Sequence, residues 1–260
     1  MSVAVILGWV GLPIGPPRVA MVEAYADKKG GPPVDHSLWN QLVKDVVSAG
    51  GWVDYEKLQT ESSRLDRYIQ SLAGVPYDEL GRDEKLALLI NAYNAFTIRL
   101  ILDYYPIKSI KDIPSNKRWK HRRWRVGGQV WSLDDIEHQQ IRPHFAEPRI
   151  HFALVCAAIG CPPLRTEAFT AGRLEKQLED QAQYVHTQPR WMRFDPAGNI
   201  IHLTRLYNWY AGDFKSASET VIGFAARYVP ALQEAMDKGS KPRVKWLDYD
   251  WTLNDRKNKL

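Results

Sequence analysis

Two thiols, Cys156 and Cys161, lie five positions apart and are the only cysteines in the 260-residue chain. An apolar run that begins at Ile150 leads into Cys156, and Cys161 follows a glycine and precedes two prolines. The apolar residues 152–155 predict a short buried strand that ends in a turn. A thiol at the end of a buried strand could be a nucleophile, half of a disulfide or an inert core residue.

A nucleophilic thiol needs a base within hydrogen-bond reach and a polar group that orients this base. His138 and His151 are the candidate bases. His151 lies five residues before Cys156, and an odd offset on a regular strand points two side chains to opposite faces, so a structural role is its alternative. His138 lies on a separate predicted helix, where Asp134 four residues earlier could hold the imidazole in one tautomer.

Other chemistries find less support in the same residues. The spacing of Cys156 and Cys161 does not match the C-x-x-C redox motif. These two thiols combined with His138 and His151 could make a zinc site on paper, but their spacing is at the long edge of the usual range. No phosphate-binding or dinucleotide-binding motif is present. We therefore expect no metal and no cofactor.

The composition is that of a soluble globular protein, with 45% apolar and 25% charged residues. A chain of 29.8 kDa can bury a core that needs no disulfides. The net charge of +5 comes largely from clusters such as residues 117–125. Because no nucleic-acid-binding signature accompanies this cluster, we interpret it as a solvated loop or hairpin and expect no nucleic-acid partner.

The N-terminal segment has the pattern of an export signal. Residues 3–14 are nearly all apolar, and Ala24-Tyr25-Ala26 forms an A-x-A-like cleavage site, although no Lys or Arg precedes the apolar run. This run is short for a membrane span, so we expect no stable membrane insertion. Residues 1–26 are predicted to be an export signal or a disordered tail, and residues 27–260 a single domain. An export signal would place the protein in the periplasm or outside the cell.

Helices are expected at residues 38–47, 58–73, 84–103, 133–142, 174–186 and 220–228. A hairpin is expected at 124–133, with strands at 199–204 and 246–253. Helices outnumber strands, and this favours a helix-rich α+β fold with a small, mostly antiparallel sheet. The helix at 84–103 is apolar almost all round and should be buried, so Asn91 and Asn94 on it must find hydrogen-bond partners.

Several of these motifs together resemble one protein family. They are residues 91–95, 131–138, 142–143 and 151–164, with further likeness at 174–181 and 207–214. The chain resembles, over about residues 80–230, the family known as domain of unknown function 547. That family in turn resembles the papain and transglutaminase-like cysteine superfamily. The resemblance implies a papain/transglutaminase-like core, a Cys nucleophile, a His base and a polar orienting group, acting on amide or thioester carbonyls.

Carried over by position, the resemblance implies Cys156 as the nucleophile and His138 as the base. Glu137 and Asn91 are the implied candidates for orienting the base or polarising the carbonyl, and Glu84, seven residues before Asn91 on the same helical face, is a further candidate. We expect Asn91, Glu84, His151, Cys161 and Arg142 around the substrate. Papain-like enzymes place the Cys before the His and on a helix N-terminus, which lowers the thiol pKa. Here His138 precedes Cys156, and Cys156 follows a predicted strand.

The leading hypothesis is a cysteine-dependent enzyme that transfers acyl groups or hydrolyses amides in a peptide-like substrate. The alternative is a non-catalytic binding module for a small, glutathione-like thiol peptide or for a protein partner. A disulfide between Cys156 and Cys161 would leave no free nucleophile. The oligomeric state is not predicted.

Overall fold

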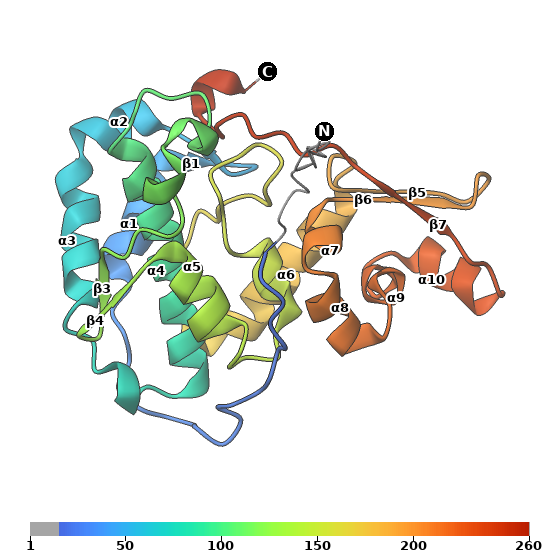
Figure 1. Cartoon of the computed structure of the whole chain (residues 1–260), viewed down its shortest axis with the longest axis horizontal. Coiled ribbons are helices and arrows are strands. Elements are labelled where there is room, and N and C mark those ends of the chain that lie inside the picture. The colour runs from blue at the N-terminus through green and yellow to red at the C-terminus, as the bar shows by residue number, and fades with distance from the viewer. Residues whose placement is uncertain (1–15, 260) are drawn as a thin grey trace, which may run out of the picture.

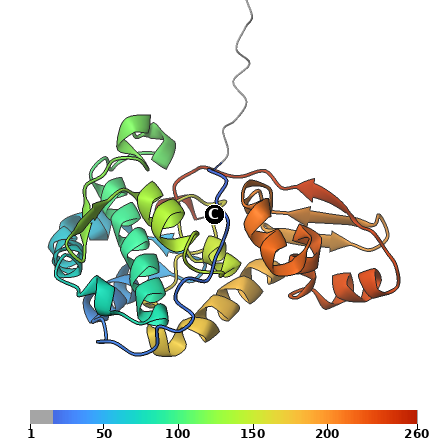
Figure 2. The ribbon, with the colours of Figure 1, turned by 60° about the horizontal axis from the view of Figure 1, so that its bottom comes forward.

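The computed structural model describes residues 16–259, which form two lobes (Figure 1). The N-terminal lobe, on the left in Figure 1, is helical. Its helices are α1 (Ser37–Val46), α2 (Tyr55–Thr60), α3 (Ser62–Leu72), α4 (Arg82–Leu102) and α5 (Leu133–Asp135). The C-terminal lobe holds a three-stranded sheet and four short helices. Helix α6 (Leu174–Thr187) runs from one lobe to the other, which is clearest in Figure 2.

Helix α4 is the centre of the N-terminal lobe and confirms the helix predicted at 84–103. Its apolar residues point in all directions, so it must be covered on all sides. It is also the one helix among residues 16–259 that is long and apolar enough to cross a membrane, but 94% of its apolar window is buried inside the protein. The single helix predicted at 58–73 is wrong. The first helix, α2, begins earlier, at Tyr55, because the Asp54 side chain caps it by accepting from the Lys57 N–H. The backbone then leaves helical geometry at Glu61, so a second helix, α3, follows.

Two small hairpins belong to the same lobe. They are β1 (Val47–Ser48) with β2 (Trp52–Val53), and β3 (Trp124–Val126) with β4 (Gln129–Trp131). The second hairpin confirms the prediction for 124–133, with Gly127 and Gly128 at positive φ in its turn. The chain then enters the helix predicted at 133–142. The Ser132–Asp135 capping box opens α5, which continues as a π-helix over Ile136–Ile141.

The sheet of the C-terminal lobe has the order β5 (Met192–Asp195), β6 (Ile200–Leu203) and β7 (Arg243–Trp246). Strands β5 and β6 are antiparallel, whereas β6 and β7 are parallel. The helices of this lobe lie on one side of the sheet in Figure 1: α7 (Leu206–Trp209), α8 (Ala211–Ser218), α9 (Val221–Ala226) and α10 (Pro230–Asp237). Small sheets among many helices confirm the α+β class.

The strand predicted at 246–253 is wrong, because β7 ends at Trp246. The chain beyond it, residues 247–255, is called the return segment here. It leaves the sheet and crosses to the N-terminal lobe, as the red trace at the top of Figure 1 shows. The Leu247 N–H still donates to Leu203 of β6, and most of the backbone hydrogen bonds beyond it go to loops of the N-terminal lobe. Leu253 is fully buried in the N-terminal core.

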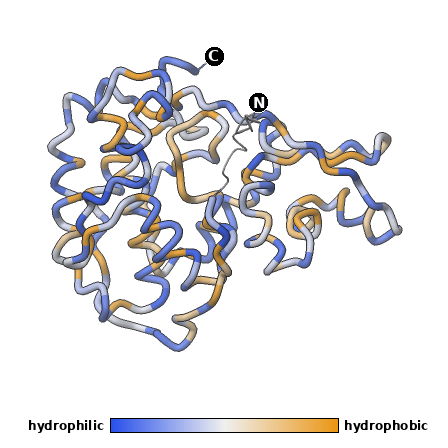
Figure 3. Tube along the Cα trace, in the orientation of Figure 1, coloured by the Kyte–Doolittle hydropathy of each residue, from blue (hydrophilic) through white to orange (hydrophobic). Residues whose placement is uncertain are grey.

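Each lobe has its own hydrophobic core, and α6 contributes to both. Leu174 and Leu178 belong to the N-terminal core, and Ala182 and Val185 to the C-terminal one. Hydrophobic stretches, orange in Figure 3, run along the inner elements of both lobes. Because one rigid helix presents apolar faces to both cores, the lobes are held to each other by the same burial that stabilises each of them.

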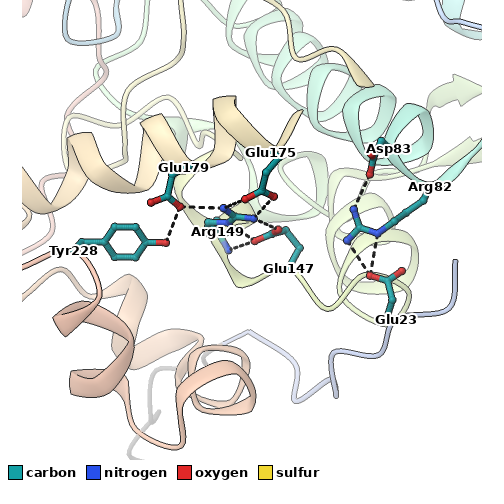
Figure 4. A network of polar contacts seen from close by, with 8 residues as sticks. All are labelled: Glu23, Arg82, Asp83, Glu147, Arg149, Glu175, Glu179 and Tyr228. Atoms are coloured by element: carbon teal, nitrogen blue, oxygen red, sulfur yellow. Dashed lines mark hydrogen bonds and ion pairs between the residues drawn. The ribbon is translucent and has the colours of Figure 1, made fainter. Parts of the chain in front are cut away.

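An ion-pair network reinforces this junction (Figure 4). The Arg149 guanidinium binds the carboxylates of Glu147, Glu175 and Glu179 at 2.6, 2.7 and 3.0 Å. Tyr228, beyond α9, donates a hydrogen bond to Glu179 at 3.4 Å. The hydrogen bonds that Arg149 donates to Glu147 raise the pKa of Arg149 above its usual range, and the guanidinium is always charged. The network ties the loop before the thiols to α6 and to the C-terminal lobe.

The segment that precedes α1 packs on the folded body. Glu23 pairs with Arg82 at 2.9 Å, as Figure 4 shows. The Ala24 N–H donates to the carbonyl of His144 at 2.9 Å, and the Tyr25 ring lies 5.2 Å from that of Phe145. The cleavage position expected after residue 26 therefore follows a stretch that contacts the folded body through Glu23, Ala24 and Tyr25. The apolar run at 3–14 lies outside the described residues.

Candidate functional site

The two cysteines lie in a loop, and the strand predicted at 152–155 is wrong. Pro148–Phe152 forms a 3-10 helix, and the chain then runs irregularly to Cys156. Asn94 on α4 provides the hydrogen bonds that a neighbouring strand would otherwise make. Its amide donates to the Ala153 carbonyl at 3.0 Å and accepts from the Val155 N–H at 2.9 Å. A buried amide from a helix thus fixes the backbone directly before the thiol.

Two side chains from the C-terminal half hold the other parts of this loop. The Gln181 amide on α6 donates to the carbonyls of Phe152 and Pro163, at 2.9 and 2.7 Å. The Trp191 indole N–H donates to the Gly160 carbonyl at 3.0 Å. The loop therefore has almost no freedom to move independently of α4 and α6.

The return segment completes this frame. The Gly160 N–H donates to the Asp250 carbonyl at 2.8 Å, and the Asn254 N–H donates to the Ala157 carbonyl at 3.0 Å. A Cβ at position 160 would lie 2.8 Å from the Asp250 nitrogen, closer than real Cβ atoms come to other atoms. Only glycine lets the two backbones approach this closely.

The return segment also brings a side chain to the first thiol. The Tyr249 hydroxyl lies 2.9 Å from Cys156 Sγ, and the Cys156 N–H donates to Cys161 Sγ at 3.2 Å. Both cysteines are free thiols; Cys156 is partly exposed and Cys161 is buried. The next residue, Ala157, has φ +59°, a left-handed conformation that costs a residue with a Cβ about 1–2 kcal/mol. Strain of this kind clusters at functional sites.

The two thiols differ in acidity. The contact with the Cys161 thiol lowers the pKa of Cys156 most, and the Tyr249 hydroxyl and the Ala158 N–H lower it further, against the effect of burial. Burial raises the pKa of Cys161 well above its usual value. Burial also raises the pKa of Tyr249, so its phenol keeps a proton to donate. Cys156 is therefore the more acidic of the two thiols.

His138 lies on the π-helix, a conformation frequent at functional sites. Its Nδ1 is 3.2 Å from the Arg142 guanidinium and 3.9 Å from the Glu137 carboxylate. Arginine can only donate, so Nδ1 accepts and the neutral ring carries its proton on Nε2. Burial, aided by Arg142, lowers the pKa of His138 to about 4. Among residues 16–259, no hydrogen bond joins His138 to Cys156, and Tyr249 is the side chain outside the loop that reaches the sulfur.

A buried cluster lies beside His138. Arg142 binds Asp213 through two hydrogen bonds of 2.6 and 3.0 Å, and His151 Nε2 lies 2.7 Å from the same carboxylate. The His151 ring stacks on Tyr210 at 3.7 Å. Burial lowers the pKa of His151, so the neutral ring donates from Nε2 to Asp213. His151 thus holds the loop to α8. Nothing in the sequence singled out Asp213, apart from its place within residues 207–214.

The remaining predicted residues lie elsewhere on α4. The Asn91 amide donates to the Phe169 carbonyl at 2.8 Å and accepts from the Phe169 N–H at 2.9 Å. Glu84 accepts a hydrogen bond from the Val34 N–H at 3.3 Å. The described contacts of Asn91 and Glu84 do not include Cys156. The predicted residues therefore form three groups: Cys156 with Cys161; Glu137, His138, Arg142 and His151; and Asn91 and Glu84.

Partly exposed aromatic rings flank Cys156, and sequence reasoning missed them. Tyr249 lies 4.8 Å from Trp209 and 4.7 Å from Trp251, and Trp251 lies 6.3 Å from Trp119. The Lys111 ammonium is 3.9 Å from the centre of the Trp251 ring. We call these four rings the aromatic cluster. Its signal in the sequence was the aromatic alternation after residue 245, which we interpreted as a strand.

Within the described part of the chain, no three His, Cys, Asp or Glu side chains gather as they would around a metal ion. A cleft of about 360 Å³ lies between the Arg149 network and α9, and its lining does not include Cys156. A second space, of about 10 Å³, lies behind Cys161 and is lined in part by Trp52, Arg190 and Asn254. This volume is near the minimum for one water molecule.

Comparison with known proteins gives one match. The model of the family described as "Protein of unknown function, DUF547" matches residues 77–184. The match includes α4, the π-helix, both cysteines and most of α6, but neither Asp213 nor Tyr249. No curated protein and no solved structure matches the chain.

Proposed function

We propose that this chain is a cysteine-dependent acyl-transfer enzyme, with Cys156 as the nucleophile and a peptide-like acyl compound as the substrate. One observation carries the proposal: the sulfur of Cys156, a partly exposed residue, lies 2.9 Å from the Tyr249 hydroxyl, and its neighbours lower its pKa. The thiolate is the reactive form of cysteine. The lowered pKa enlarges the thiolate fraction of Cys156 relative to an ordinary thiol.

In the proposed reaction the thiolate attacks the substrate carbonyl carbon, and the C–S bond forms while the carbonyl π electrons move to oxygen. The Ala158 N–H, which already acts on the Cys156 sulfur, is a candidate donor to this oxyanion. The oxyanion then reforms the carbonyl and expels the leaving group, and water or a second nucleophile releases the acyl group from Cys156.

The nature of the leaving group favours acyl transfer from a thioester over amide hydrolysis. A thiolate leaves without a proton, whereas an amine must be protonated. The Tyr249 hydroxyl is the proton donor at hydrogen-bond distance from the sulfur, and burial raises its pKa, which makes it a weak acid. His138, neutral with its proton on Nε2, is unsuited to the role of base or acid. A papain-like thiolate–imidazolium pair finds no support in these contacts.

The test is the capture of an acyl-enzyme. The protein is mixed with a peptidyl thiophenyl ester at pH 7, and adducts are located by intact mass and peptide mapping. We expect one acyl group on Cys156, formed at least about tenfold faster than on free glutathione because the thiolate fraction is larger. Cys156→Ala should give no adduct. The matched variant Cys161→Ala should still acylate at Cys156, more slowly. Acylation at the glutathione rate, or at another residue, would overturn the proposal.

A binding module without turnover is the second candidate, and the aromatic cluster favours it, because exposed tryptophan and tyrosine rings are common at binding sites. Such a module would bind a thiol peptide such as glutathione, or a protein partner. Product release separates the two functions: an enzyme frees more than one equivalent of thiophenol per protein, and a module does not.

A further inference from the structure

We infer that the aromatic cluster and Lys111 together bind the substrate, and that they select an acidic peptide with an apolar side chain. This inference rests on the proposed function of Cys156 and names its substrate class. The observation behind it is a surface next to the thiol that combines uncovered aromatic rings with positive charges.

The aromatic part is built from three separate pieces of the chain. Trp209 comes from α7, Tyr249 and Trp251 from the return segment, and Trp119 from the loop before β3. The residues that carry the four rings are all partly exposed. Tyr249 is the member of the cluster whose hydroxyl contacts Cys156 Sγ. Rings that converge from distant elements and remain open to solvent can bury an apolar side chain of a ligand. A ligand seated there has its backbone within reach of the thiol.

The charged part lies at the Trp251 end of the cluster. Lys111 Nζ lies over the Trp251 ring, and Arg118 donates to the carbonyls of Lys111 and Ile113 at 2.5 and 2.7 Å. Neither cation forms an ion pair with a carboxylate of residues 16–259. Asp112, in the same turn, accepts from the backbone N–H groups of Lys108 and Ser109 instead. No carboxylate of the described residues therefore neutralises either positive charge.

Contacts through two rings connect Lys111 to the thiol: Lys111 lies over Trp251, whose ring is 4.7 Å from that of Tyr249, and the Tyr249 hydroxyl contacts the Cys156 sulfur. Burial, and then the neighbouring Arg118, lower the pKa of Lys111, while the Cys156 sulfur raises it. A substrate carboxylate next to Lys111 and Arg118 would relieve this repulsion. A cationic side chain, which aromatic rings can also attract, would meet Lys111 already on the Trp251 face. Charge complementarity therefore favours an acidic ligand over a basic one.

The test uses two isosteric probes that differ by one charge. Iodoacetyl-Phe-Glu-amide and iodoacetyl-Phe-Gln-amide alkylate Cys156, and iodoacetamide reports the reactivity of the thiol itself. At low salt we expect the Glu probe to react about tenfold faster than the Gln probe, and the ratio should fall in 0.5 M salt. Lys111→Gln should remove most of the preference for the Glu probe, because only Arg118 then remains, and Lys111→Arg should keep it. Trp251→Ala should slow both peptides relative to iodoacetamide.

Lys117→Gln is the matched control, because Lys117 is exposed in the same loop and should leave the ratio unchanged. Equal rates for the two peptides in the unmodified protein, or a ratio that Lys111→Gln leaves unchanged, would overturn this inference and leave the acyl-transfer proposal intact. If all three reagents instead alkylate Cys156 no faster than they alkylate free glutathione, the proposed function itself fails.

Discussion

Tyr249 lies 93 residues after Cys156 in the chain, yet its hydroxyl is 2.9 Å from the sulfur. Cys156 lies within the family match at 77–184, and Tyr249 lies outside it. The return segment connects them by crossing from the sheet of the C-terminal lobe to the thiol loop. The immediate surroundings of the thiol therefore depend on both lobes.

Replacing Tyr249 with Phe should make Cys156 less acidic, because the sulfur loses a donor that stabilises its anion. The measurement is the iodoacetamide alkylation rate as a function of pH. In the unmodified protein we expect the half-maximal rate below pH about 8.5, the value for an ordinary thiol, and Tyr249→Phe should move it upward. Tyr104→Phe, at an exposed tyrosine, is the control. An unchanged profile in Tyr249→Phe would show that this contact does not tune the thiol.

Gly160→Ala should also make Cys156 less acidic, although it changes neither the Cys156 nor the Tyr249 side chain. Its Cβ would meet the Asp250 backbone at 2.8 Å, so the return segment must move and Tyr249 with it. We expect a loss of about 1–3 kcal/mol in the free energy of unfolding and an upward shift of the alkylation profile. Gly172→Ala is matched to it, because nothing lies within 4 Å of that Cβ, and should change neither. A Gly160→Ala protein with normal stability and reactivity would contradict the close packing.

Local signals in the sequence predicted several elements correctly. The all-round apolar pattern gave α4, the paired glycines gave the β3–β4 hairpin, and the Ser132–Asp135 spacing gave the start of α5. Each of these depends on residues within a few positions of one another. The requirement that Asn94 find buried partners was also visible, although the partners themselves were not.

The errors concern the thiol loop and the return segment, which both resemble strands in sequence. They do meet, at an isolated bridge between Ala158 and Leu253 and at the hydrogen bond from the Gly160 N–H to the Asp250 carbonyl, but they form no continuous ladder. Elsewhere their backbone groups bond to the Asn94 and Gln181 side chains or to single carbonyls. An apolar pattern records that a segment is buried, and it does not record whether a strand or an amide side chain satisfies the backbone. Tyr249 was missed for this reason.

Asp213→Asn should destabilise the protein strongly. It removes the charge that neutralises Arg142 inside the protein, where the two side chains are 4% and 1% exposed. Breaking a buried pair in this way lowers the free energy of unfolding by about 3–5 kcal/mol. Denaturant unfolding measures this loss. Glu234→Gln breaks the exposed pair with Lys238 and should cost less than about 1 kcal/mol. Similar losses in the two variants would argue against the buried cluster.

The protein should lose stability as the pH falls from about 6.5 to about 4. Burial lowers the pKa of His186 to about 4, whereas an unfolded histidine titrates near 6.5. Between these values the unfolded chain binds the proton and the folded chain does not, so acid favours unfolding. The neutral ring donates from Nδ1 to the Ala182 carbonyl and accepts from the Tyr207 hydroxyl at Nε2. Unfolding free energies measured across this range should decrease less steeply in His186→Gln, and an equal slope would contradict this assignment.

Two N-terminal truncations should behave differently. Removing residues 1–15 leaves every contact described above in place. Removing residues 1–26, as cleavage after Ala26 would, deletes the Glu23–Arg82 ion pair, the packing of Tyr25 and the carbonyl of Pro17 that Arg142 Nη1 binds at 2.9 Å. We expect the longer truncation to lower the melting temperature by several degrees, at about 2–4 °C per kcal/mol for a chain of this size. Equal melting temperatures would show that residues 16–26 add no stability. Cleavage after Ala26, which the proposed export requires, would then leave the fold intact.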